Sequence, residues 1–192
     1  MSSPESSPPR AAGPRPAAVP SARPRRGIKA ALFAPVLLAL AGAGIVRAAI
    51  AVGAAFPPLA ASDLTGGAVP ATAGKVVLVD FWASWCAPCQ ASFPAHAKLY
   101  ADYAARGLVV VAVSVDENPA AYAAFVQRFH PPFPALHDRA QQLVRQVSVP
   151  AMPTCYLLGR DGRVRYVHEG FHGADTERAL RREIDLLLAE PR

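Results

Sequence analysis

The chain has 192 residues, a length that predicts one domain with an appended segment, and its formal net charge at pH 7 is +6. Of the 20 basic and 14 acidic side chains, seven basic and one acidic lie in residues 1–47, so the rest of the chain is neutral. Because nucleic-acid binding requires a basic patch on the folded domain, this distribution gives no support for a nucleic-acid partner.

Residues 1–29 contain seven prolines and many serines and alanines, a composition that predicts a disordered basic leader. Residues 30–46 then form a run of 17 residues without a charge, directly after Arg23, Arg25, Arg26 and Lys29. Because such a basic flank stays in the cytoplasm, we expect residues 30–55 to be a transmembrane signal-anchor. A spanning helix needs about 20 residues and a signal-peptide core about 7 to 15, so a cleaved signal peptide remains the alternative.

Residues 56–192 alternate between strand-like and helix-like patterns. In chain order we expect a strand over 75–82, a helix over 87–105, a strand over 108–115, helices over 119–129 and 139–146, strands over 154–158 and 163–168, and a helix over 174–189. The last helix is amphipathic, because its leucines and its isoleucine fall on one face. This order predicts an α/β domain with a central sheet covered on both faces.

Two cysteines, Cys86 and Cys89, lie where the first strand ends and the first helix begins. The thiolate is the nucleophile in disulfide exchange, and a helix N-terminus stabilises negative charge. We therefore expect Cys86, nearer the exposed turn, to attack and Cys89 to resolve the mixed disulfide. A structural disulfide or half of a zinc site is the alternative. Zinc would need two further ligands, and the candidates by spacing, His168 and His172, fall at a strand end and in a loop, so we expect no metal.

Residues 79–89, Val-Asp-Phe-Trp-Ala-Ser-Trp-Cys-Ala-Pro-Cys, resemble the active-site segment of thioredoxins. The resemblance extends to Met152-Pro153-Thr154, which matches the cis-proline and threonine that begin a later strand in that family. Gly159-Arg-Asp-Gly162 follows as a hairpin turn between two strand-like runs. The resemblance covers residues 56–192 and implies a thioredoxin-like fold with a central mixed β-sheet flanked by helices.

Within this superfamily the chain is similar to the exported TlpA, ResA and DsbE branch. That narrower match is carried by Phe93-Pro94 after the cysteines, by Phe133-Pro134, and by an added helical segment at about 118–130, the TlpA-type helical insertion. Two residues depart from the branch, which often has Asn at the place of Asp80 and Glu at the place of Ser92. Asp80 is instead the thioredoxin residue, so acid–base tuning is expected to follow the thioredoxin pattern.

The resemblance also implies the roles of individual residues. Asp80 is expected to be a buried carboxylate that exchanges a proton with Cys89. Substrate binding is assigned to four residues around the cysteines, namely Trp85, Pro88, Met152 and Pro153. We expect the peptide bond before Pro153 to be cis, and Cys155 to be a small buried strand residue.

The implied function is a thiol:disulfide oxidoreductase in the bacterial cell envelope, with the Cys86–Cys89 pair as its redox-active disulfide and no other cofactor. We expect it to reduce disulfide-containing partners, either apocytochrome c or copper-site proteins, and to be reduced by a membrane thiol carrier of the DsbD or CcdA kind. The domain would be periplasmic, held at the inner membrane by residues 30–55 or released after cleavage. A copper-binding chaperone of the Sco type, with His168 or His172 as a ligand, and a thiol peroxidase are the alternative functions.

Overall fold

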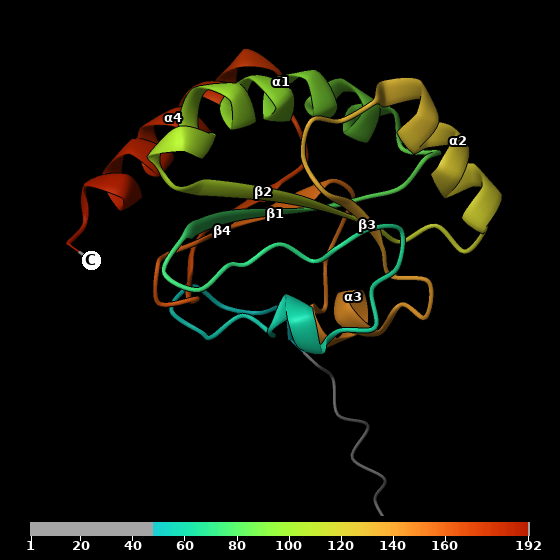
Figure 1. Cartoon of the computed structure of the whole chain (residues 1–192), viewed down its shortest axis with the longest axis horizontal. Helices are drawn as coiled ribbons and strands as arrows, with labels where there is room; N and C mark the ends of the chain where they lie inside the picture. Colours follow the sequence, from blue (N-terminus) through green and yellow to red (C-terminus); the bar gives the residue numbers. More distant parts are fainter. Residues whose placement is uncertain (1–47, 192) are drawn as a thin grey trace, which may run out of the picture. The chain divides into compact units, whose positions relative to one another are not determined.

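The computed structural model describes residues 48–191; the predicted leader 1–29 and residues 30–47 of the predicted anchor lie outside the described residues. A five-stranded sheet lies between two layers of helices (Figure 1). The elements in chain order are β1 (Val76–Trp82), α1 (Ala87–Tyr103), β2 (Leu108–Ser114), α2 (Pro119–Phe129), β3 (Ala135–His137), α3 (Gln142–Val147), β4 (Thr154–Leu158), β5 (Val164–Glu169) and α4 (Ala174–Ala189), with short 3₁₀ turns at Leu59–Ala61 and Ala104–Arg106.

The sheet has the strand order β3-β2-β1-β4-β5, in which β1 pairs in parallel with β2 and antiparallel with β4. The central strand β1 is buried along its whole length, in keeping with its run of β-branched residues. Because β4 runs antiparallel to β1, its first residue, Thr154, lies opposite Phe81 near the end of β1. The C-terminal ends of β1 and β2 and the start of β4 therefore lie side by side at one end of the strands.

The two faces of the sheet carry separate apolar clusters. Helices α1, α2 and α4 cover one face, and α3 covers the other (Figure 1). Side chains of β1 alternate between them, with Leu78 and Trp82 packing toward α1 and Val77, Val79 and Phe81 toward α3. By the same alternation Asp80 points toward α1, which places a carboxylate inside an apolar layer.

Each helix and strand predicted from the sequence is present, with boundaries that move by up to three residues. The predicted insertion is α2. Its N-cap residue is Asn118, whose side-chain oxygen accepts a hydrogen bond of 2.9 Å from the N–H of Ala120. The sequence analysis missed β3, a three-residue strand at the edge of the sheet beside Pro134. A strand this short shows no alternation, and only its pairing with β2 defines it.

Residues 48–55, the end of the predicted membrane segment, lie against the domain. The N–H of Ile50 donates to the carbonyl of Val147 at 3.0 Å, and the N–H of Gly53 donates to that of Val164 at 2.7 Å. Residues just before the predicted boundary at residue 56 thus contact the domain. Within residues 48–191, no helix combines the length and apolar character that crossing a membrane requires.

The ring of Tyr156 packs between Phe56 and Phe81 on the α3 face, and its hydroxyl has no hydrogen-bond partner among the described residues. Burial, followed by the charge of Glu169, raises the pKa of Tyr156 to about 12. A tyrosine in the unfolded chain ionises near pH 10, so above about pH 10 the unfolded state binds fewer protons than the folded state. The free energy of unfolding therefore falls as the pH rises from about 10 to about 12.

Replacing Tyr156 with phenylalanine is expected to remove this alkaline loss. At pH 7, Tyr156→Phe should leave the free energy of unfolding unchanged or raise it by up to about 1 kcal/mol, because an unpaired buried hydroxyl is removed. Urea unfolding at pH 7 and across the alkaline range tests both effects. Tyr122→Phe is the control: its hydroxyl donates to the carbonyl of Ala135 at 2.7 Å, so its loss should cost about 1 kcal/mol. Equal losses for the two variants would contradict the prediction.

Candidate active site

The Cys86–Cys89 disulfide spans the first turn of α1, with 5.2 Å between the two Cα atoms. Cys86 is the N-cap residue of this 17-residue helix, and its sulfur accepts a hydrogen bond of 3.2 Å from the N–H of Cys89. Pro88 lies in the first turn, where a missing N–H costs no intrahelical hydrogen bond. A helix N-terminus stabilises negative charge, so Cys86 lies where the sequence analysis expects the attacking thiolate.

Exposure differs sharply around the pair. Cys89 is fully buried, Cys86 retains 5% of its surface, and the adjacent Trp85 is 72% exposed. Pro88 is exposed as well. Cys86 therefore lies between exposed residues at the surface of the domain, whereas Cys89 has no exposed surface. This asymmetry is what an attacking and a resolving cysteine require.

The Met152–Pro153 segment lies at the same end of the strands as the C-terminal end of β1. The peptide bond between these two residues is cis, as predicted, and β4 begins at the next residue, opposite Phe81. Met152 is half-buried and Pro153 is buried. The register thus brings this segment to the end of β1 from which the chain continues to Trp85 and Cys86. The substrate-binding roles of Trp85, Pro88, Met152 and Pro153 remain predictions.

The loop before Cys86 is held by a buried carboxylate that the sequence analysis missed. Asp116, just beyond β2, accepts hydrogen bonds from the N–H and the hydroxyl of Ser84 and from the hydroxyl of Ser114, at 2.8–3.1 Å. The side-chain amide of Gln90 donates to the carbonyl of Ser84 at 3.0 Å. These contacts tie the cysteine loop to the end of β2. An acidic residue just after a predicted buried strand was the signal available in the sequence.

Asp80 is fully buried on β1, in agreement with the prediction, and lies opposite Cys155 on β4. Ser92, where relatives were expected to carry Glu, is buried on α1, and its hydroxyl donates to the carbonyl of Cys89 at 2.9 Å. At the position of Ser92 this chain thus has a hydroxyl in place of an acid, and the buried carboxylate of Asp80 lies on β1.

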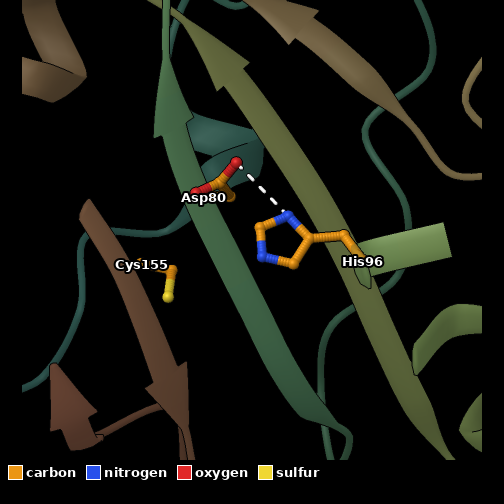
Figure 2. A group of neighbouring side chains, drawn as sticks. All are labelled: Asp80, His96 and Cys155. Atoms are coloured by element: carbon orange, nitrogen blue, oxygen red, sulfur yellow. Dashed lines mark ion pairs between the residues drawn. The ribbon is translucent and has the colours of Figure 1, made fainter. Parts of the chain in front are cut away.

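His96 is a further buried titratable residue, and the sequence analysis assigned it no role. Its Nδ1 lies 3.4 Å from Oδ2 of Asp80, and both side chains are at most 1% exposed. Figure 2 shows the imidazole reaching from α1 toward the Asp80 carboxylate, with Cys155 on the neighbouring strand β4. Spacing could have identified it, since His96 follows Cys89 by seven residues, which places both on one face of a helix.

Asp80, His96 and Cys155 form a buried cluster whose potential ligand atoms lie within 4.8 Å of one another. A structural zinc site has four protein ligands, and this cluster supplies three. Burial, and then the charges of Asp80 and Glu183, raise the pKa of the Cys155 thiol well above its usual range, so its sulfur is a neutral thiol.

Comparison with known proteins agrees with this geometry. The Redoxin family model matches residues 51–183. The thiol-disulfide oxidoreductase ResA of Geobacillus thermodenitrificans is 34% identical over 126 residues, which cover 65% of this chain and 72% of the relative. ResA of Geobacillus kaustophilus is 33% identical over 137 residues, 70% of this chain and 79% of the relative.

Solved structures agree on the fold. A Chlorobium tepidum protein assigned as the thiol:disulfide interchange protein DsbE superposes with a TM-score of 0.59 at 39% identity, over 62% of this chain and 83% of that one. StoA from Bacillus subtilis, at 22% identity, has a TM-score of 0.51 over 57% of this chain and 84% of its own. The predicted thioredoxin-like fold is therefore confirmed. Over residues 51–183 the chain belongs to the Redoxin family, and it is a thiol-disulfide oxidoreductase related to ResA.

Proposed function

We propose that the protein reduces disulfides of envelope proteins through Cys86 and Cys89, with cytochrome c maturation or copper-site partners as substrates. The observation that carries this proposal is the disulfide at the start of α1, where Cys86 is the N-cap residue beside the exposed Trp85. The similarity to ResA and DsbE supports envelope partners. The disulfide is the only cofactor proposed.

The reaction proceeds in two exchanges. The Cys86 thiolate attacks one sulfur of the partner disulfide, a Cys86–partner bond forms, and the other partner sulfur leaves as a thiolate. Cys89 then gives its proton to Asp80, and its sulfur attacks that of Cys86. The Cys86–Cys89 bond forms, the second partner sulfur leaves, and both partner thiolates take protons from water. The partner gains two electrons, and the protein is oxidised by two.

The electrons are restored by a membrane thiol carrier of the DsbD or CcdA kind. Residues 30–55 anchor the domain on the periplasmic side of a bacterial inner membrane, and cleavage into a soluble form is the alternative.

Partner trapping tests the proposal. In a Cys89→Ser variant of the full chain, the mixed disulfide through Cys86 is not resolved, so partner adducts should accumulate in the envelope and disappear on reduction. The matched control, Cys86→Ser with Cys89→Ser, should yield none. Mass spectrometry identifies the partner cysteines. A Cys89→Ser protein that forms no adducts, or forms them without Cys86, would refute the reductase role.

The reduction potential decides the direction of electron flow. Equilibration with glutathione should give a value nearer that of thioredoxin, about −270 mV, than that of the oxidant DsbA, about −120 mV. A value close to DsbA would assign the protein to disulfide formation instead.

The copper-chaperone alternative requires His168 or His172 as a third ligand. Nε2 of His168 lies 2.6 Å from Oε2 of Glu183, so this ring already has a partner. No observation on the described residues favours this alternative or the thiol peroxidase.

A further inference from the structure

Two titratable side chains, Asp80 of β1 and His96 of α1, form a buried pair. Both carboxylate oxygens of Asp80 and Nδ1 of His96 are buried and have no hydrogen-bond partner among the described residues. Only their mutual contact, 3.4 Å between Oδ2 and Nδ1, is available to them (Figure 2). A buried carboxylate without a counter-charge costs several kcal/mol. A positive charge on the neighbouring imidazole would offset this cost.

The other titratable groups around the pair cannot supply the compensating charge. Cys155 faces Asp80 from β4, and its pKa lies well above the usual range, so it stays neutral. Glu183 of α4 is acidic and is itself paired with His168 of β5 at 2.6 Å. Cys89 of α1 is bound in the disulfide. His96 is thus the group in contact with Asp80 that can carry a positive charge.

His96 also lies on the same face of α1 as the resolving cysteine. Cys89, Ser92 and His96 are spaced at i, i+3 and i+7, which places them in one stripe along the helix, and all three are at most 1% exposed. The stripe faces β1, where Asp80 alternates with Leu78 and Trp82 of the same apolar cluster. The pair therefore lies within the layer that holds Cys89.

We propose that His96 is a positioning residue that keeps Asp80 ionised as the proton acceptor for Cys89; this rests on the reductase mechanism proposed above. Before resolution the pair is a carboxylate and an imidazolium. The Cys89 thiol passes its proton to Asp80, and the imidazolium stays protonated beside Asp80. That thiolate attacks Cys86, forms the Cys86–Cys89 bond and expels the partner thiolate. The proton on Asp80 then leaves to solvent, which restores the pair.

Rapid mixing of the reduced full-length protein with oxidised glutathione, followed by acid quenching and mass spectrometry, measures resolution of the Cys86–glutathione disulfide across the pH range. His96→Asn retains a hydrogen-bond donor near the Nδ1 position but cannot carry a charge. His96→Leu has neither the donor nor the charge. In both variants resolution at pH 7 should slow by about tenfold or more and recover as the pH rises. Thermal unfolding establishes that each variant is folded.

Two further readouts separate this role from packing. In an Asp80→Asn background, His96→Leu should slow resolution little further, because the two residues act as a unit. Infrared spectroscopy of the oxidised protein should find Asp80 as a carboxylate in the wild type and as a protonated acid in His96→Asn. A wild-type pH profile in His96→Asn, or additive effects in the double variant, would overturn the inference. Absence of any exchange by the wild type would instead overturn the proposed function.

Discussion

Replacing Cys86 with serine should lower the rate of disulfide exchange by about three orders of magnitude or more, the scale on which loss of an activated nucleophile acts. The reason is local geometry: Cys86 is the N-cap residue of α1 and lies between the exposed Trp85 and Ala87, whereas Cys89 is fully buried. Cys89 cannot take over the attack, because a partner disulfide cannot reach its sulfur. Turnover of a model disulfide such as insulin, with a thiol reductant, measures the effect.

Cys155→Ala is the matched control for this experiment. It also removes one cysteine, but Cys155 lies within β4 between two buried residues, and burial raises its pKa well above the usual range. Its thiol is therefore neither accessible nor ionised near pH 7, and exchange should persist. In reduced folded protein, iodoacetamide should modify Cys86 and spare Cys155. Substantial exchange by Cys86→Ser, or rapid alkylation of Cys155, would contradict the assignment.

Replacing Phe93 with alanine should destabilise the oxidised protein by about 3 to 5 kcal/mol. Phe93 is 3% exposed and lies at the centre of an aromatic cluster on the α1 face of the sheet. Its ring centroid is 5.1 Å from that of Trp82 on β1 and 4.8 Å from that of Phe125 on α2. The side chain thus joins the cysteine helix, the central strand and the inserted helix, and its removal opens a cavity between all three. Urea unfolding gives the free energy.

Leu186→Ala on α4 is the control, since Leu186 is 56% exposed and should change the free energy of unfolding by no more than about 0.5 kcal/mol. Phe93→Leu keeps most of the volume and should cost less than Phe93→Ala. A loss below about 1 kcal/mol for Phe93→Ala would mean that α2 does not depend on this cluster.

Local patterns predicted most of the fold correctly. The apolar run of β1, the cap and proline that begin α2, and the turn between β4 and β5 each specify their element through neighbouring residues. The strand β3 was missed because its three residues owe their conformation to pairing with β2. The contact of Ile50 with Val147 could not be read from local patterns either, since it joins residues far apart in the chain.

The sequence by itself determined the chemistry of this protein: the Cys86–Cys89 pair at a strand–helix junction, the buried Asp80 and the cis Pro153 are local features of the chain. Only the tertiary structure decided what surrounds them. Asp116, after β2, accepts a hydrogen bond from Ser84, after the neighbouring strand β1. His96 of α1 contacts Asp80 of β1 inside the apolar layer. The charge balance of a buried carboxylate depends on which group packs against it, and that is settled when helix and sheet come together.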